Sequence, residues 1–189
     1  MKDTSVDQVF LAPITRELRR IGANVDAGGS GHVWWCRATV AGTISDCTVS
    51  VTAEQLSGSL VVVTCRASTT ISPSITPGVD PVEHDPQGHA NGLILLDLIN
   101  ALELAAGALS LCTNPAILSL HCVFPIRDAI PTNIARFALR SVAMVDRASE
   151  PLRSVLLGSQ DPGEAFSRMI EKGFRPSSRL TDDHPREPA

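Results

Sequence analysis

The sequence lacks two features that would indicate a nucleic acid or a membrane as partner. It has no excess of positive charge, with a net charge of -4, whereas binding of nucleic acid normally needs a basic face. Its first residues lack the pattern of a signal peptide, and the apolar run from Leu93 to Leu104 is too short to span a bilayer. We therefore expect a cytoplasmic protein with no nucleic-acid partner and no membrane partner.

The sequence also lacks the cysteine spacing of a metal site or of a disulfide framework. Its five cysteines are odd in number and widely spaced, and no Cys-x-x-Cys pair occurs. They fall within predicted strands, which is typical of small buried side chains in a reducing compartment. The five positions are Cys36, Cys47, Cys65, Cys112 and Cys122.

The glycine-rich segment from Asp26 to Gly31 lacks the context of a catalytic or phosphate-binding loop. A nucleophile elbow needs a strand before it and a helix after it, and the order predicted here is the reverse. A phosphate loop would be followed by Lys-Ser or Lys-Thr, which does not occur here. Because several glycines also remove any side-chain stripe, we predict that the segment is a flexible loop.

What the sequence does contain is a clear succession of helix and strand patterns. Apolar residues at helical spacing predict helices over 5–22, 90–104 and 131–156. Runs rich in β-forming residues predict a meander over 32–41, 43–52 and 59–68, and a hairpin over 107–113 and 116–124. We expect an α+β fold ordered helix, three strands, helix, two strands, helix. Its antiparallel sheet should have helices packed mainly on one face.

The length of 189 residues suits one domain followed by a tail. The domain is expected to span 1–158 and to include a long proline-rich loop over 69–89. The tail, 159–189, contains a short amphipathic helix over 163–172 and a polar end that we expect to be disordered. The apolar side of this helix is formed by Phe166, Met169 and Ile170. We expect it to dock on an apolar groove in place of a ligand.

Two segments hold histidines beside residues that suit a metal or catalytic site. The loop 83–89 places His84 and His89 near carboxylates and could bind a divalent metal, but a proline-broken loop is poorly suited to fixing metal geometry. His121 adjoins Cys122, yet neighbours on a strand point to opposite faces and cannot share a proton. We therefore predict no catalytic residue and no cofactor, with a metal at the loop as the alternative.

The predicted meander has apolar residues on both of its faces. Trp34 lines one face of the first strand, so the adjacent Trp35 must project from the other. If helices cover only one face, an apolar patch stays open, and such a patch usually marks an interaction surface. Hydroxyl side chains on the middle strand would make it amphipathic, as suits an extended peptide. Its alternative fates are burial by the tail or by a second copy. The predicted peptide-binding residues are Val33, Trp35, Leu60 and Val62.

Three segments carry a resemblance to a known family. They are Val33-Trp34-Trp35-Cys36 in the first strand, Leu98-Ile99-Asn100 in the middle helix, and Met144 to Leu152 in the last helix. Together with the order of elements, they make Val6 to Leu156 similar to the YbjN family and the related type III secretion chaperones. The resemblance implies a small cytoplasmic protein that binds other polypeptides, often as a homodimer, without cofactor or catalytic residues. The proline-rich loop and the tail depart from the family's pattern.

From these patterns we predict a non-catalytic polypeptide-binding module, chaperone-like or regulatory, that uses the sheet face around Trp35. One alternative is a homodimeric structural or regulatory protein without a client, with the nearly all-apolar helix 90–104 as its interface. The other is a metal- or small-ligand-binding enzyme that uses the loop 83–89.

Overall fold

The computed structural model describes residues 11–20, 23–30, 32–57, 60–71, 86–102, 107–113, 116–125 and 131–174. These residues form four helices and six strands. The helices are α2 (Ala12–Arg20), α3 (Pro86–Asn100), α4 (Pro131–Leu156) and α5 (Pro162–Glu171). The strands are β1 (Asn24–Ser30), β2 (Val33–Val40), β3 (Cys47–Ser57), β4 (Leu60–Thr70), β5 (Ala108–Thr113) and β6 (Ala116–Pro125).

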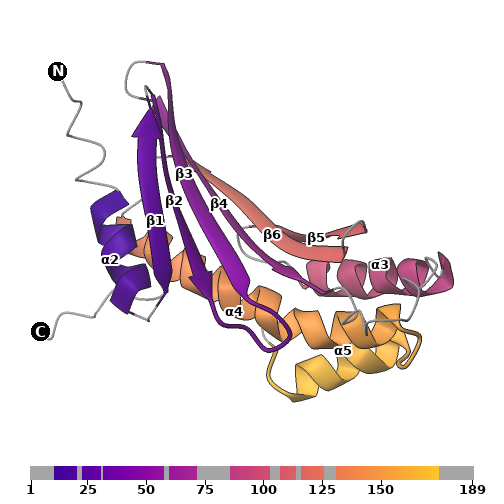
Figure 1. The fold of residues 1–189 in the computed structure, drawn as a ribbon. Coiled ribbons are helices and arrows are strands. Elements are labelled where there is room, and N and C mark those ends of the chain that lie inside the picture. The colour runs from indigo at the N-terminus through magenta and orange to yellow at the C-terminus, as the bar shows by residue number, and fades with distance from the viewer. Residues whose placement is uncertain are drawn as a thin grey trace, which may run out of the picture.

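The six strands form one antiparallel sheet in the order β1-β2-β3-β4-β6-β5 (Figure 1). The first four strands follow one another along the chain. α3 follows β4 along the chain, and the β5–β6 hairpin after it joins the sheet through pairing of β6 with β4. This topology leaves β1 and β5 as the two edge strands.

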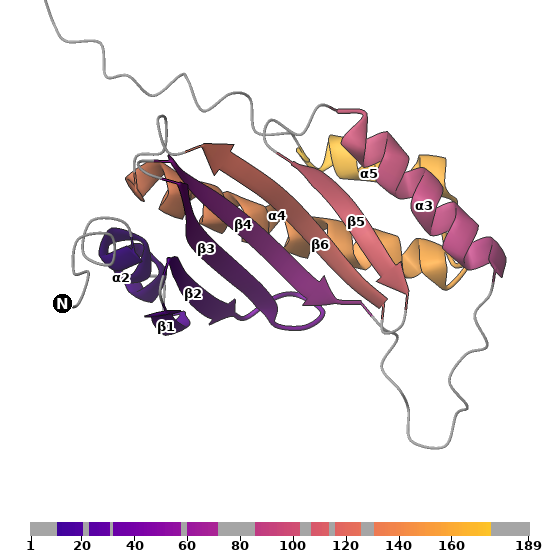
Figure 2. The ribbon, with the colours of Figure 1, turned by 90° about the horizontal axis from the view of Figure 1, so that it is seen from above.

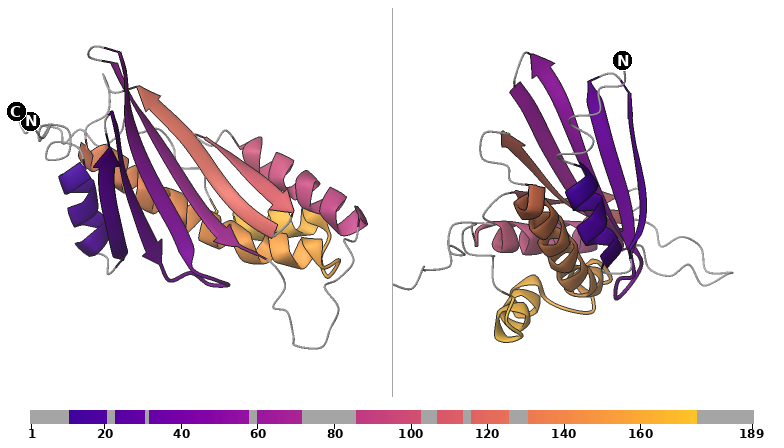
Figure 3. Two further views of the ribbon diagram at one scale, coloured as in Figure 1. Left: turned by 45° about the horizontal axis from the view of Figure 1, so that its top comes forward. Right: turned by 90° about the vertical axis from the view of Figure 1, so that its left-hand side faces the viewer.

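The helices pack mainly on one face of the sheet, with α3 lying along its β5 edge (Figure 2). Figure 2 looks onto the other face, with α4 passing behind the strands, and Figure 3 shows the same layering from two further directions. α4 contacts β3, β4 and β6 in the middle of the sheet. α2 packs against α4 and β1 at one end, and α3 and α5 pack against α4 at the other. The predicted α+β class, with an antiparallel sheet and helices on one face, is confirmed.

The hydrophobic core fills the space between the sheet and α4. Every second residue of the central strands points into it, because successive side chains of a strand alternate between faces. The inward residues of β2, β3 and β4 include Trp34, Cys36, Val49, Val51, Val63 and Cys65, all buried. α4 meets them with Ile134, Ala138, Val145, Ala148, Leu152 and Val155. Removal of this apolar surface from water, at about 25 cal/mol per Å², is the main force that holds the two layers together.

The two longest helices differ in how closely they follow the sequence prediction. α4 spans Pro131–Leu156, as its apolar stripe predicts. α3 begins at Pro86, before the predicted start at 90, because proline is well tolerated in the first turn of a helix. Further along α3, Gly92 allows close contact with α4: a Cβ there would lie 2.8 Å from Leu156 Cδ2.

The glycine-rich segment predicted to be a loop forms the edge strand β1 instead. Gly28 is paired with Trp35 and Gly29 with Trp34. A Cβ on Gly28 would lie 3.0 Å from Trp35 Cζ2, and one on Gly29 would lie 2.6 Å from Trp34 Cδ1. The loop prediction is wrong because these glycines make room for two indole rings on opposite faces of the sheet.

Two polar contacts connect the helices to the sheet and its loops. Asp146 on α4 accepts hydrogen bonds from the amide (2.5 Å) and the hydroxyl (2.9 Å) of Thr43. Asn100, at the end of α3, donates from Nδ2 to the Leu109 carbonyl (3.0 Å), and its Oδ1 accepts from the Leu109 amide (2.9 Å). With Thr43 held in a loop, β3 begins at Cys47, later than predicted.

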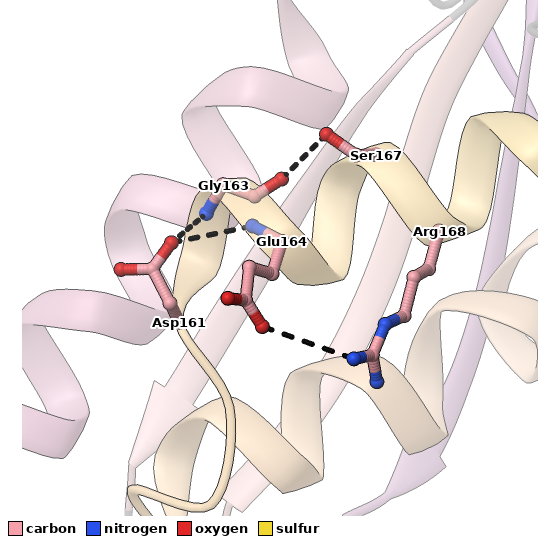
Figure 4. A network of polar contacts seen from close by, with 5 residues as sticks. All are labelled: Asp161, Gly163, Glu164, Ser167 and Arg168. Carbon is pink, nitrogen blue, oxygen red and sulfur yellow. Dashed lines mark hydrogen bonds and ion pairs between the residues drawn. The ribbon is translucent and has the colours of Figure 1, made fainter.

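A capped N-terminus marks the start of α5 (Figure 4). The Asp161 carboxylate accepts hydrogen bonds from the amides of Gly163 (2.8 Å) and Glu164 (3.2 Å), which satisfies two donors that lack partners within the helix. Arg168 pairs with Glu164 at 3.8 Å, an exposed contact that stabilises the helix only slightly. On its other side α5 buries Met169 against the helical layer.

Candidate functional site

The candidate binding surface is the face of the sheet that no described helix covers, which we call the open face. Every second residue of each strand lies on it, and the pairing register aligns these residues into bands that run across the strands. Three bands of different chemistry follow one another along the strand direction. They are, in order, an apolar band, a cationic band and a hydroxyl band.

The apolar band contains the predicted peptide-binding residues. Val33 and Trp35 on β2 expose 37% and 42% of their surface. Val62 on β4 shares their face, because it pairs with Glu54, which in turn pairs with Val33, and it is half-buried. Leu60 lies at the start of β4, and its side chain is outside the part of the structure that is described. The structure thus places Val33, Trp35 and Val62 on the same face, with Glu54 of β3 between Val33 and Val62.

Val123 on β6 extends the apolar band and is absent from the sequence prediction. It is 55% exposed, and the pairing places it in line with Trp35 through Thr52 and Thr64. The alternation along β6 predicts that Val123 is exposed, because it must face away from the buried Cys122. Finding its neighbours required the register between β4 and β6, which the sequence does not reveal.

The cationic band lies next to the apolar band. It consists of Arg37, Ser50, Arg66 and His121, aligned across β2, β3, β4 and β6, and the same row ends at the exposed Asp26 on β1. Arg37, Arg66 and His121 are exposed, and none of them forms an ion pair within the described residues. Arg66 Nη2 donates to Ser119 Oγ at 3.2 Å, which orients its guanidinium along the sheet. The two arginines therefore present positive charge that forms no ion pair among the described residues, although Asp26 is the cross-strand neighbour of Arg37.

The hydroxyl band completes the open face. It consists of Thr39, Thr48, Ser68, Ser119 and Ser110, aligned across β2, β3, β4, β6 and β5. Ser119 is buried and accepts from Arg66, so the other four hydroxyl groups are the ones available to a partner. Hydroxyl groups both donate and accept hydrogen bonds, so these four can meet either the amide or the carbonyl of a peptide backbone. The open face therefore offers apolar, charged and neutral polar contacts within one continuous sheet.

The histidine segments do not gather into a site. His84 lies outside the described residues, and His89 lies in the first turns of α3. Within the described ranges, no group of three or more histidine, cysteine, aspartate or glutamate side chains is placed to hold a metal ion. His121 is exposed and Cys122 is buried, so the two side chains lie on opposite faces, as the strand alternation predicts.

The buried cysteines are poor nucleophiles. Burial raises the pKa of the Cys36 thiol to about 11 and also raises the pKa of Cys47. The pKa of Cys65 is also raised, mainly by a hydrogen bond with Cys122 and secondly by burial. Since the thiolate is the reactive form, these cysteines act as small core side chains.

Another exposed apolar surface lies on the outer side of α3. Leu93 and Ile94 are 43% and 50% exposed, whereas Leu95, Leu96 and Ile99 of the same helix are buried. α5 packs on α3 and α4, with Met169 buried. The described part of the tail therefore lies on the helical side of the molecule and leaves the open face uncovered.

Comparisons with known proteins do not assign this chain to a family. No model of a known protein family matches it, and no curated protein does. The similarity to the YbjN family and the type III secretion chaperones stays a prediction. Among the described helices, none is long and apolar enough to cross a membrane.

Proposed function

We propose that this protein binds a segment of another polypeptide on its open face, in a chaperone-like or regulatory role that needs neither catalysis nor a cofactor. The observation that carries the proposal is Trp35, a large aromatic side chain left 42% exposed on the open face beside the exposed Val33. Tryptophan is enriched among the residues that contribute most to protein–protein binding. Exposed apolar area also costs about 25 cal/mol per Å², which a bound partner would recover.

The neighbouring bands fit a polypeptide better than a small ligand. A peptide presents apolar side chains, charges and backbone amides along its length, and the open face offers a complement to each. Small ligands, in contrast, normally occupy concave pockets. The implied similarity to polypeptide-binding chaperones agrees with this class of partner.

The test compares two exposed apolar residues on opposite sides of the molecule. Peptides selected from a random library by the full chain are titrated against Trp35→Asp and against Leu157→Asp, since Leu157 is 47% exposed beside the helical layer. Trp35→Asp should weaken binding by roughly tenfold or more, as loss of an aromatic anchor does. Leu157→Asp should leave the affinity unchanged.

A thermal unfolding measurement on both variants serves as the control for this test. Each replaces an exposed side chain, so each should keep a cooperative transition close to that of the wild type. If Trp35→Asp folds and still binds the selected peptides with wild-type affinity, the open face is not the binding site.

The exposed pair on α3 supports a second candidate role, a homodimer built on that helix. Leu93 and Ile94 lie one after the other on its outer side, where a second copy of the same helix could cover them. Sedimentation equilibrium of Leu93→Asp should then show a weaker dimer than the wild type, while Leu157→Asp should not differ from it. A wild type that stays monomeric at every concentration contradicts this candidate.

A further inference from the structure

The cationic band narrows the chemistry of the partner. We infer that the open face binds a polypeptide segment in which apolar and acidic side chains alternate, lying across the strands; this inference rests on the proposed function. The segment would place its apolar side chains on the Trp35 band and its carboxylates on Arg37, Arg66 and His121. It differs from the proposed function in naming both the composition and the direction of the ligand.

The spacing of the two bands matches an extended chain. Residues two positions apart on a strand are separated by about 6.7 Å, so the bands through Trp35 and Arg37 run side by side at that distance. An extended peptide projects successive side chains to opposite edges. A segment lying flat across the strands can therefore contact the apolar band with one edge and the cationic band with the other.

The positive charge is free to meet a carboxylate. Two strand spacings of about 4.8 Å separate Arg37 from Arg66, which places the two guanidinium groups within reach of two acidic side chains on one edge of the segment. Arg66 uses Nη2 for Ser119, and its other N–H groups can donate to a carboxylate. Asp26 is paired with Arg37 in the sheet, yet no ion pair joins them.

Two acidic residues on the open face, Glu54 on β3 and Asp26 on β1, set the orientation. Glu54 is paired with Val33, and Trp35 lies between that position and Arg37 along β2. A carboxylate on the ligand is thus repelled at the Glu54 end of the surface and attracted at the Arg37 end. Asp26 repels a carboxylate at the β1 end of the cationic row in the same way. The acidic edge of the segment must therefore lie over the arginines and extend toward Arg66, away from β1.

Nucleic acid fits this surface less well, although it is also anionic. Single-stranded nucleic acid stacks successive bases on several aromatic side chains, and Trp35 is the one such side chain among the described positions of the open face. The net charge of -4 also repels a long polyanion more than a short peptide with few charges.

The experiment measures the affinity of the full chain for defined synthetic probes. Three peptides of equal length alternate leucine with glutamate, with glutamine or with lysine, and a single-stranded DNA oligonucleotide is the fourth probe. The Leu/Glu peptide should bind roughly tenfold more tightly than the Leu/Gln peptide, as expected for two exposed charge pairs. Added salt should weaken the binding of the Leu/Glu peptide and leave the affinity for the Leu/Gln peptide unchanged.

Variants then locate the charge contacts. Arg37→Gln and Arg66→Gln should each reduce the preference for the Leu/Glu peptide by roughly threefold, about the value of one exposed ion pair. Arg140→Gln, which changes an exposed arginine on α4, is the matched control and should have no effect. Arg37→Gln removes no hydrogen bond found in the described structure, so its folding should stay intact.

The outcomes separate this inference from the proposed function. If Arg37→Gln and Arg66→Gln both keep the preference for the Leu/Glu peptide, the inference of an acidic ligand is wrong. If Trp35→Asp alone then loses affinity for all three peptides, peptide binding on the open face is still supported. A wild type that binds no peptide refutes both. If the oligonucleotide binds more tightly than the Leu/Glu peptide and loses affinity in Arg37→Gln, the anionic partner is a nucleic acid and the inference is wrong.

Discussion

The two faces of the sheet use the same strands for different purposes, and the adjacent tryptophans of β2 show this most clearly. Trp34 is 4% exposed and lies among core residues, whereas Trp35 is 42% exposed on the open face. One residue step along a strand separates a side chain that stabilises the fold from one that is available to a partner. Substitutions on the two faces should therefore separate stability from binding.

The largest effect should come from truncating the buried tryptophan. Trp34→Ala removes a buried indole and leaves a cavity, which should lower the free energy of unfolding by about 3–5 kcal/mol. Trp35→Ala should lower it by no more than about 1 kcal/mol, because the side chain is half in water. Urea unfolding of the two variants measures the contrast. Equal losses would mean that Trp35 is also a core residue.

The next effect concerns the contact between α3 and β5. Asn100→Leu removes two hydrogen bonds to Leu109 and leaves its amide and carbonyl without these partners. We expect a loss of about 1–3 kcal/mol of unfolding free energy, with peptide affinity unchanged because the contact lies at the β5 edge, away from Trp35 and the arginines of the open face. Asn91→Leu, on the same helix but with a contact only to Gln87 (3.0 Å), is the control. A comparable loss of unfolding free energy in both variants would show that the hydrogen bonds to Leu109 do not stabilise the fold.

The glycines of β1 should repeat the contrast between the faces on a smaller scale. Gly29→Ala drives a Cβ to 2.6 Å from the buried Trp34 ring, which cannot move away, and should cost about 1–3 kcal/mol. Gly28→Ala meets the exposed Trp35 ring at 3.0 Å, and that ring can shift outward. Thermal unfolding should rank Gly29→Ala below Gly28→Ala in stability. The reverse order would contradict the assignment of the two rings.

The ionisation of the buried cysteines should have the smallest effect on the free energy of unfolding at neutral pH. Burial raises the pKa of Cys36 from its ordinary value of 9.0 to about 11, so the folded chain holds this proton more tightly than the unfolded chain. The free energy of unfolding should therefore be unaffected below pH 9 and should fall as the pH rises from 9 to 11. Cys36→Ala should reduce this slope in urea titrations. If the slope is unchanged in that variant, other groups cause it.

The elements with strong periodic patterns could be predicted from sequence. The stripe of α4 gave its bounds, and the alternation in β2 placed Trp34 and Trp35 on opposite faces. β1 could not be found in this way, because Gly28 and Gly29 have no side chains to show a period and are explained only by the rings they contact. The cationic band was also hidden, since Arg37, Arg66 and His121 come from separate strands and meet only through the pairing register.

The most direct test of the open face uses a chain in which Trp35 is the single tryptophan. In Trp34→Phe, a conservative change in the core, acrylamide quenching of tryptophan fluorescence reports the accessibility of Trp35 alone. We expect strong quenching in the free protein and marked protection when the alternating Leu/Glu peptide is added. Weak quenching before any peptide is added, or equal quenching with and without saturating peptide, would contradict the claim that this face is open and binds a polypeptide.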